Sequence, residues 1–494
     1  MNVNPLIAFL DKDASQFTKS DIIKFIKANQ IKILNFRCVG SDGRLKTLTF
    51  VVDNEQHLDA ILTAGERVDG SSLFPFIEAG SSDLYVIPRY RTAFVNPFSD
   101  IPALDILCSY YDKDGNPLAI SSENILRKAQ QTLQERTGHT FHAMGELEYY
   151  AISDDNGLYK TENQRGYHES SPFAKWSDLR TEAMLLSARC GGQLKYGHAE
   201  VGNFSLDGKL YEQNELEFLP CDAEDAANQL LIAKWILRSL GNKYGVTISF
   251  APKITIGKAG SGMHIHTKLV KDGKNCMSIN GGLTDVAKKA IAGYLSLAPS
   301  LTAFGNTNPT SYFRLVPHQE APTNICWGDR NRSVLVRVPL GWTGKTSMIQ
   351  DSNPIEPVDN TDFSQKQTVE FRCSDNSADI HLLLAGLIVA ARHGLEMPDA
   401  LEYAQQRYVD VNIFDDAHKH RTQTLEQLPV SCAESAARLA QQAEIYKKYD
   451  VFPQAVIDGF VKKLKSYNDE NLRAEISNDE SKIVEIVNKY FHCG

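Results

Sequence analysis

Residues 145–152 read Gly-Glu-Leu-Glu-Tyr-Tyr-Ala-Ile, a strand-like stretch in which two glutamates flank a leucine. In a β-strand, residues i and i+2 point to the same face. Glu146 and Glu148 are therefore expected on one face and Leu147 on the other. Burying both carboxylates is costly unless they are paired or bind a cation. A solvated strand face is the alternative for this stretch taken alone.

Three further stretches repeat this spacing, which suggests that one face of a sheet collects charged groups. They are Glu215-Leu-Glu217, His264-Ile-His266 and Glu370-Phe-Arg372. About 220 residues separate the first pair from the last, so only the fold can bring them together. Carboxylates converging with a histidine favour a site for hard divalent cations.

The segment Gly260-Ser-Gly-Met-His-Ile-His266 is the more specific of these signals. Two glycines let the backbone approach another group closely, and two histidines follow on one predicted strand face. A single histidine is more often a core or surface residue. Two of them at this spacing after a Gly-Ser-Gly turn favour a functional site.

Arginines gather in the next part of the chain: four of them, Arg314, Arg330, Arg332 and Arg337, occur within 24 residues. The planar guanidinium suits carboxylate and phosphate groups, and structural ion pairs are the alternative. Glu370 and Arg372 would place one metal-type and one anion-type side chain on the same strand face.

Composition limits the class of protein. The 494 residues carry a formal net charge of −9, which argues against a nucleic-acid binder. Nine scattered cysteines form no C-x-x-C motif, which favours a reducing compartment. No signal peptide is visible, and the longest apolar run, residues 382–391, is too short to span a bilayer. We therefore expect a cytoplasmic protein without a membrane partner.

The pattern along the chain predicts two regions. Up to about residue 115 we expect a small mixed domain with a four- or five-stranded sheet, built from a helix at 19–30, a hairpin at 31–52 and strands at 84–88 and 103–111. The turn-rich segment 112–117 would end it. Beyond it, a helix begins near Ser121. Further helices are predicted at 222–243, 284–297 and 379–394, with strands at 248–256, 262–270, 334–339 and 367–373, and a mostly helical region from 431.

Together these segments resemble glutamine synthetases of the bacterial-type class I. The resemblance covers roughly residues 20–470, in the family's order. Its most specific pieces are Asp69-Gly-Ser-Ser72, Gly260 to His266, Asn308-Pro-Thr, Arg314-Leu-Val-Pro, Glu320-Ala-Pro, Arg330-Asn-Arg-Ser and Glu370-Phe-Arg372.

The resemblance implies an α+β fold, with an N-terminal β-grasp domain (1–115) and a C-terminal catalytic α/β domain (116–494) whose curved sheet is mainly antiparallel. It also implies a homo-oligomer, a dodecamer of two hexameric rings, in which neighbouring subunits share each active site. The enzyme would be a glutamate–ammonia ligase that joins ammonium to the γ-carboxylate of L-glutamate through γ-glutamyl phosphate. ATP is the implied co-substrate, with two or more Mg²⁺ or Mn²⁺ ions in each site.

The resemblance further implies a role for each matching residue. One ion would be held by Glu148, Glu200 and Glu215, and the second by Glu146, His264 and Glu370. Glutamate would be bound by Arg314, Arg372 and the Gly260 backbone. The nucleotide would meet His266, Lys268, Arg332 and Arg337. Asp69 and Ser72 would reach into the site of the adjacent subunit, where Asp69 would bind ammonium and, with Glu200, help to remove its proton. Tyr167 would lie beside the ammonium site. Glu320 would lie on a loop that closes over glutamate and excludes water.

The sequence also departs from the family pattern. An insertion, residues 204–211, lengthens the spacing between Glu200 and Glu215, so that Glu217 is the alternative ligand; Asp207-Gly208 would be a hairpin tip. His318-Gln319 and Ala259 differ around the substrate pockets. They keep open a γ-glutamyl ligase that uses an organic amine or polyamine. A catalytically silent scaffold or regulator is the other alternative. Phe414 replaces a tyrosine that some members adenylylate, which excludes that control at this position.

Overall fold

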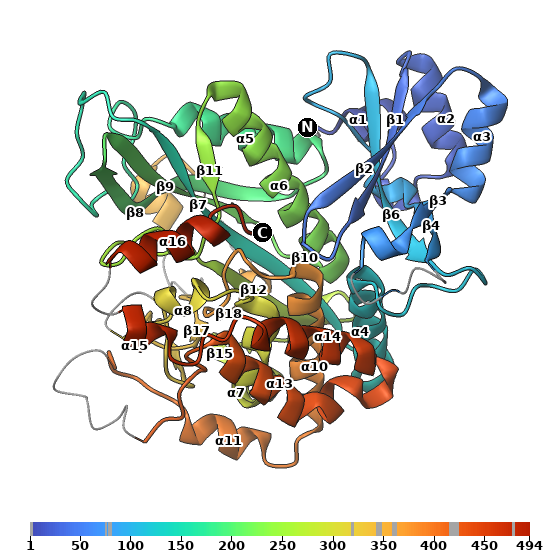
Figure 1. The fold of residues 1–494 in the computed structure, drawn as a ribbon. Coiled ribbons are helices and arrows are strands. Elements are labelled where there is room, and N and C mark those ends of the chain that lie inside the picture. Colours follow the sequence, from blue (N-terminus) through green and yellow to red (C-terminus); the bar gives the residue numbers. More distant parts are fainter. Residues whose placement is uncertain are drawn as a thin grey trace.

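The computed structural model describes residues 3–74, 77, 82–317, 321–341, 348–357, 363–413, 424–476 and 480–494. The predicted positions His318, Gln319, Glu320 and Phe414 lie outside these residues. The described chain forms two large sheets, each with its own helices, and one two-stranded sheet. Figure 1 shows the N-terminal sheet beside the larger C-terminal part.

The N-terminal part is a six-stranded sheet in the order β2-β1-β6-β4-β3, with β5 paired to β6. Its strands are β1 (Ile33–Val39), β2 (Leu45–Val51), β3 (Glu66–Asp69), β4 (Asp83–Pro88), β5 (Phe94–Val95) and β6 (Ala103–Tyr111). Its helices are α1 (Pro5–Leu10), α2 (Lys19–Ala28) and α3 (Glu55–Ala64). The expected count of four or five strands was too low. The two short strands β3 and β5 were missed because β3 is mostly exposed and polar, and β5 has only two residues.

A ten-stranded sheet forms the second part, in the order β16-β17-β18-β12-β7-β9-β8. Its long strands are β7 (Thr140–Asp154), β8 (Leu194–Leu206), β9 (Lys209–Phe218) and β12 (Met263–Lys271). Its short strands are β10 (Cys221–Asp222), β11 (Thr247–Ser249), β13 (Lys274–Asn275), β16 (Trp327–Asp329), β17 (Val336–Val338) and β18 (Val369–Phe371). Among the described strands of this sheet, every pair except β16 with β17 is antiparallel. The strand predicted at 248–256 was wrong beyond its first residues, because only Thr247–Ser249 pairs with β7.

The helices of this part are α4 (Ser122–Thr137), α5 (Ser177–Arg189), α6 (Ala223–Tyr244), α7 (Asp285–Gly305), α8 (Ser311–Arg314), α9 (Met348–Ser352), α10 (Ile380–Glu396), α11 (Ala400–Gln406), α13 (Cys432–Lys447), α14 (Gln454–Lys465), α15 (Leu472–Ile476) and α16 (Glu480–Tyr490). Of these helices, α4, α5, α6 and α7 pack on the sheet, while α10, α11, α13 and α14 pack on other helices. A small separate hairpin joins β14 (Ser278–Ile279) to β15 (Gly282–Leu283).

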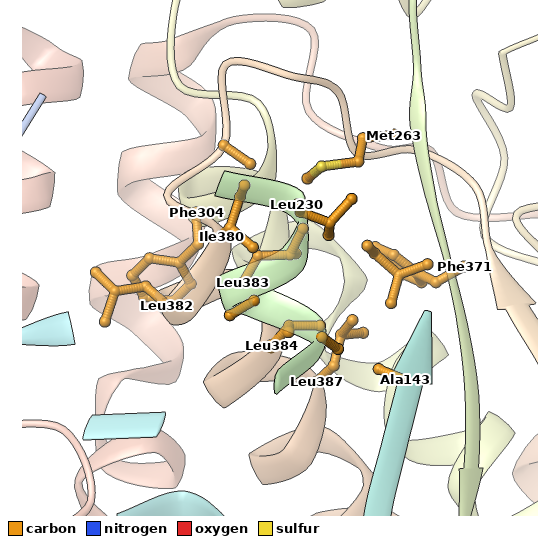
Figure 2. Packing of buried hydrophobic residues seen from close by; sticks show 14 of the residues in the cluster. Ala143, Leu230, Met263, Phe304, Phe371, Ile380, Leu382, Leu383, Leu384 and Leu387 are labelled. Atoms are coloured by element: carbon orange, nitrogen blue, oxygen red, sulfur yellow. The ribbon is translucent and has the colours of Figure 1, made fainter. Parts of the chain in front are cut away.

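The core lies between the sheet and α6, α7 and α10. Figure 2 shows Leu230 of α6, Met263 of β12 and Phe371 of β18 packed against leucines of α10, among them Leu383. These strand residues alternate with the charged pairs, so that the same strands offer an apolar face to the helices and a charged face on the other side.

Helix α10 contains the apolar run that the sequence predicted as a buried helix. It begins after Asp379, whose side chain accepts a hydrogen bond from the Leu382 amide, as an N-cap does. It crosses α7 closely at Gly293, where any Cβ atom would collide with the Ala390 carbonyl. Within the described residues, no single helix is long and apolar enough to cross a membrane. Helices α10 and α11 together have sufficient length and apolar composition, but they are bent by 110° relative to each other.

Candidate active site

The charged pairs meet on the face of the ten-stranded sheet opposite the one that packs against α6 and α7. Residues directly opposite each other in an antiparallel pair share a face. The register forms three rows. The first is His198, Glu215 and Glu148; the second is Tyr196, Glu217, Glu146 and His264; the third is His266, Glu370 and Arg337. Five strand pairings thus assemble groups that lie far apart in the sequence.

The first row is rich in carboxylates, and His198 lies directly beside Glu215. The His198 Nε2 atom lies 3.1 Å from Glu215 Oε2. Glu148 is held through Oε2, which accepts hydrogen bonds from the Gly262 amide (2.7 Å) and from the Gln213 amide group (3.1 Å). Glu200 lies next to a register irregularity of β8, with His198 Nδ1 3.9 Å from its Oε1. Glu148, Glu200 and Glu215 therefore stand on adjoining positions of three neighbouring strands.

The inserted segment lengthens β8 and β9 without breaking this row. Asp207 and Gly208 form the hairpin tip with φ of 49° and 75°, the left-handed values of a tight turn. The predicted tip is confirmed, and Glu215 keeps its place opposite Glu148.

Glu217, the alternative ligand, has a partner of its own. Its Oε2 forms a 2.7 Å ion pair with Lys195. Glu217 is also near His198 and Glu215, and one ligand atom from each of the three lies within 4.8 Å of the others. A lysine ammonium on Glu217 makes Glu215 the more available of the two carboxylates for a cation.

Imidazoles and arginines surround the carboxylates of the second and third rows. Glu146 contacts His264 Nδ1 at 2.9 Å and His266 Nε2 at 2.8 Å. Glu370 is fully buried; it pairs with Arg337 at 2.6 Å and with Arg372. The second group of possible ligand atoms comprises Glu146, His266 and Glu370, and His264 Nδ1 lies 3.5 Å from Glu370. His266 thus belongs to the same cluster as the predicted ligand His264.

Arg314 lies against the glycine turn that the sequence singled out. Its guanidinium donates to the carbonyl oxygens of Cys373 (2.9 Å) and Ser374 (3.3 Å) and approaches His264 Nε2 at 3.4 Å. A Cβ atom at Gly262 would collide with this guanidinium. The glycine is therefore needed for the close approach of Arg314 to the cluster.

The carboxyl groups of this face fall into two halves with opposite pKa shifts: Glu215 in the first row, and Glu146 and Glu370 in the second and third rows. Burial raises the pKa of Glu215 well above its usual range, and the charges of Glu146 and Glu148 raise it further. Burial alone would also raise the pKa of Glu370, yet Arg372 and Arg337 lower it overall. In the same way, His266 and His264 outweigh burial and lower the pKa of Glu146. Nearby charges of opposite sign favour an ionised carboxylate, and charges of like sign disfavour it.

Other predicted residues lie around this face. Tyr167 is half exposed and packs edge-on against His198, with ring centroids 5.4 Å apart. Exposed Arg332 is close enough to lower the pKa of Tyr167, although burial dominates and raises it. Lys268 Nζ lies 3.4 Å from the Gln365 carbonyl oxygen. The Gly260 carbonyl accepts a 3.0 Å hydrogen bond from Gln213.

Asp69 and Ser72 lie in the N-terminal part, at the end of strand β3 and in the turn that follows it. Both are exposed. Asp69 accepts hydrogen bonds from the hydroxyl groups of Ser71 (2.7 Å) and Ser72 (2.6 Å), and these lower its pKa to about 2. The predicted site residue Glu320 falls outside the described residues.

The sequence analysis missed His198 and Lys195. His198 and Glu200 stand two residues apart, the spacing that identified the other pairs, so this signal was present. Lys195 gave no such signal, because its contact with Glu217 depends on how β8 pairs with β9.

The donor set fits divalent cations and an anionic substrate. Carboxylate oxygens and imidazole nitrogens suit Mg²⁺ or Mn²⁺, and the repulsion around Glu215 calls for positive charge. The Nε atoms of Arg337 and Arg372 are buried without a hydrogen-bond partner among the described atoms. Buried donors are normally satisfied. Arg89, Arg392 and Arg473 have the same unpartnered Nε atom away from this face, so the two atoms are compatible with an anionic ligand without requiring one. Such a face defines a metal-assisted enzyme that acts on an anionic substrate.

Comparison with known proteins agrees with this class. The model of the glutamine synthetase catalytic domain matches residues 120–484, and that of the glutamine synthetase beta-grasp domain matches residues 30–113. The chain belongs to the glutamine synthetase family. The resemblance inferred from its motifs and the α+β fold with an N-terminal β-grasp domain are thereby confirmed.

Relatives and solved structures cover nearly the whole chain. Glutamine synthetase of Clostridium saccharobutylicum is 28% identical over 443 residues, which are 88% of this chain and 91% of that protein. The Mycolicibacterium smegmatis enzyme is 27% identical over 491 residues, 92% and 95% of the two chains. Plasmodium falciparum glutamine synthetase superposes with a TM-score of 0.74 at 19% identity (92% and 97% covered), and ligand-free GmaS with 0.74 at 16% identity (93% and 99% covered). These two structures show the shared fold.

Proposed function

We propose that this enzyme ligates ammonium to the γ-carboxylate of L-glutamate at the expense of ATP, through γ-glutamyl phosphate, and releases glutamine, ADP and phosphate. The observation that supports this most strongly is the single sheet face on which carboxylates and imidazoles adjoin arginines with unsatisfied Nε atoms. Phosphoryl transfer needs charge neutralisation and positioning more than covalent catalysis, and this face offers groups for both.

In this proposal the cations are Mg²⁺ or Mn²⁺, at least two in each site. Glu148, Glu200 and Glu215 would hold one, and Glu146, His264 and Glu370 the other. When bound, the ions would neutralise the charge of the phosphate groups. The 3.1 Å contact between His198 and Glu215 makes His198 a candidate to orient that carboxylate.

The anion-binding residues divide between the two substrates. Glutamate would be bound by Arg314, Arg372 and the Gly260 backbone, all close to the glycine turn. The triphosphate would be bound by Arg332 and Arg337, with His266 and Lys268 on the nucleotide side. The γ-carboxylate oxygen of glutamate would attack the γ-phosphorus of ATP, the bond from that phosphorus to the bridging oxygen would break, and ADP would leave. Arg332 would stabilise the charge that develops on the transferred phosphoryl group.

A neighbouring subunit would complete the part of the site that binds ammonium. Asp69 and Ser72 are exposed and distant in sequence from the sheet face, which suits a contribution to the site of an adjacent chain. The low pKa of Asp69 keeps its carboxylate ionised and able to bind ammonium. Asp69 and Glu200 would help to remove a proton from the bound ammonium, since only neutral ammonia is nucleophilic. Tyr167 would lie beside the ammonium. The Glu320 loop would exclude water from the acyl phosphate.

This sharing implies an oligomer, which we propose to be a dodecamer of two hexameric rings in the cytoplasm. Each subunit would divide into domains 1–115 and 116–494, with the turn at 112–117 between them. In the described residues, one apolar cluster fills most of the N-terminal part and another most of the C-terminal part, but Phe94 and Leu107 belong to the second cluster and Leu118 to the first.

Phosphate release from ATP tests the acceptor directly. With saturating ATP and Mg²⁺, glutamate plus ammonium should release phosphate and yield glutamine, whereas glutamate plus methylamine or a polyamine should release little. The reverse preference would identify an organic-amine ligase. Absence of metal-dependent ATP turnover with every amine would identify a catalytically silent member of the family.

Arg332→Ala tests the phosphate side of the proposal. Because Arg332 is exposed, the substitution should leave folding and assembly intact while turnover falls about 10³-fold. Arg330→Gln, two residues away and also exposed, is the matched control and should retain activity. Full turnover in the Arg332 variant would show that its role is misassigned.

A further inference from the structure

The partner strands of β7 change at Glu148, on the edge of β7 that faces away from β9. Strand β12 pairs with β7 as far as Leu147, opposite Met263, and β11 pairs with it only from Tyr150 onward. Among the described strands, none therefore lies beside the main chain of Glu148 on this edge. A buried carbonyl group needs a hydrogen-bond donor, and here the donor is a side chain.

Asn376 supplies that donor. It is fully buried in the segment between β18 and α10, and its Nδ2 atom donates to the carbonyl oxygens of Glu148 (2.7 Å) and Gly262 (3.0 Å). Both hydrogens of the side-chain amide are thus used. The opposite orientation of the amide would set its oxygen against two carbonyl oxygens, so these contacts fix its orientation. Asn376 therefore joins β7 to the glycine turn at the point where the pairing of β7 with β12 ends.

This bridge bears on the carboxylate of Glu148 through Gly262. Continuing the register of Leu147 with Met263 by one step places Gly262 opposite Glu148. With its carbonyl held by Asn376, Gly262 donates its amide N–H to the Glu148 carboxylate, at 2.7 Å from Oε2. Gly262 is also the glycine that leaves room for the Arg314 guanidinium. One side-chain amide thus links a proposed cation ligand to the place where Arg314 enters the cluster.

The main chain around Asn376 is itself held in place. The Asn376 carbonyl accepts a 2.8 Å hydrogen bond from Lys234 of α6, a side chain only 3% exposed. The carboxylate of the preceding residue, Asp375, accepts hydrogen bonds from the Asn306 side-chain amide (2.8 Å) and from the Ser377 amide (2.9 Å). A side chain can hold another group precisely only when its own support is fixed, and this condition is met here.

We propose that Asn376 is a positioning residue of the active site that acts through Glu148. Its amide holds the main chains of Glu148 and Gly262 so that the Gly262 N–H fixes the Glu148 carboxylate for binding a divalent cation. Groups behind a metal ligand set the orientation of that ligand. This role rests on the proposed function only in that Glu148 binds a cation, because the hydrogen bonds of Asn376 are present without one.

Hydrogen exchange of the metal-free full chain tests the bridge without any cation or substrate. The Gly262 amide should exchange slowly, as measured by mass spectrometry on overlapping peptides. Asn376→Asp keeps the shape of the side chain but replaces the donor with an acceptor, and the Gly262 amide of this variant should exchange about tenfold faster. Fast exchange in the wild type, or equally slow exchange in the variant, would overturn the proposal.

Mn²⁺ binding, followed by electron paramagnetic resonance, tests the consequence for Glu148. In Asn376→Asp and Asn376→Ala, the affinity for one ion should fall about 10- to 100-fold, and the other ion should be affected less. The Mg²⁺ concentration at half-maximal turnover should rise by the same factor, whereas kcat at saturating Mg²⁺ should change much less. A loss of kcat with unchanged ion affinity would show a merely structural role.

Asn124→Ala is the matched control for the loss of a buried bridging amide. Asn124 is also buried, and its side-chain amide also donates to two main-chain carbonyl oxygens, those of Tyr110 (3.2 Å) and Leu118 (3.1 Å). Both Asn124→Ala and Asn376→Ala should lower the midpoint of urea denaturation, but the control should bind both ions with wild-type affinity. An equal loss of ion affinity in the two variants would reflect instability alone and would overturn the proposal.

The outcomes separate the role of Asn376 from the proposed function. If the wild type binds two ions and the Asn376 variants bind both equally well, the positioning role fails and the proposed function stands. If the wild type binds no divalent cation, the proposed function fails, and the role of Asn376 in ion binding fails with it. If neither Asn376 variant folds, Lys234→Met, which removes the hydrogen bond to the Asn376 carbonyl, should speed exchange at Gly262 severalfold. Unchanged exchange in that variant would overturn the proposal.

Discussion

The two halves of the catalytic face use carboxylates in opposite ways. On β8 and β9, Glu215 is surrounded by other glutamates, and its pKa is raised. On β12, β17 and β18, Glu370 contacts two arginines, and its pKa is lowered. The first half lacks positive charge that a divalent cation can supply. In the second half, arginines and histidines of the protein already neutralise part of the charge of Glu370 and Glu146. One sheet face thus joins a half whose carboxylates repel one another to a half whose carboxylates are paired with arginines and histidines.

Removing a carboxylate from the neutralised half should have the largest effect on stability. Glu370→Ala leaves Arg337 and Arg372 without their buried partner, and we expect a loss of about 3–5 kcal/mol in the free energy of unfolding. Urea denaturation of the metal-free protein measures it. Glu434→Ala, which breaks an exposed pair with Arg438, is the control and should cost less than about 0.5 kcal/mol. A loss for Glu370→Ala as small as that of the control would show that Glu370 does not neutralise Arg337 and Arg372 in the folded protein.

The pH dependence of the metal-free protein sharpens the comparison. The pKa of Glu215 in the folded state lies above its usual value of 4.5, so between these two values the folded state binds a proton that the unfolded state does not. Stability should therefore fall as pH rises above about 4.5. Glu370 behaves in the opposite sense, because its stabilisation is present above pH 4.5 and is lost only as pH falls toward its lowered pKa.

Glu215→Gln isolates the first of these contributions. Without the titrating carboxyl, the metal-free variant should lose less stability between pH 5 and 8 than the wild type does. Denaturation midpoints across that range measure the difference. A parallel decline in both proteins would assign the effect to other groups.

The fold was largely predictable because strand periodicity is local. Alternation around Glu146, His264 and Glu370 identified three site strands, and the apolar run from residue 382 identified α10. The cluster of His266 with Glu146 was not predictable, since it depends on the register of β12 against β7. The short strands β3 and β5 were missed for a similar reason: partners distant in sequence define them.

Long-range pairing also decided which glutamate of β9 is free for a cation. The sequence left Glu215 and Glu217 as alternatives, because both point to the same face. Only the pairing of β8 with β9 brings Lys195 to Glu217 and His198 to Glu215. A lone lysine outside any motif carries no signal of such a contact.

The smallest expected effect concerns this lysine. Lys195 is 39% exposed, so solvent screens its pair with Glu217, and Lys195→Ala should cost only about 1 kcal/mol of stability. The cost should disappear in a Glu217→Gln background, which a double-mutant cycle measures. A cost that persists there would mean that Lys195 acts through packing against Tyr196, whose ring it contacts at 4.7 Å.

Binding of Mn²⁺ by the purified protein, followed by electron paramagnetic resonance, tests the central claim most directly. The wild-type chain should bind two ions tightly, whereas Glu215→Gln should lose one of them and keep the ion at Glu146, His264 and Glu370. If both proteins bind the same number of ions, or if neither binds any, the carboxylates around Glu215 do not hold a divalent cation.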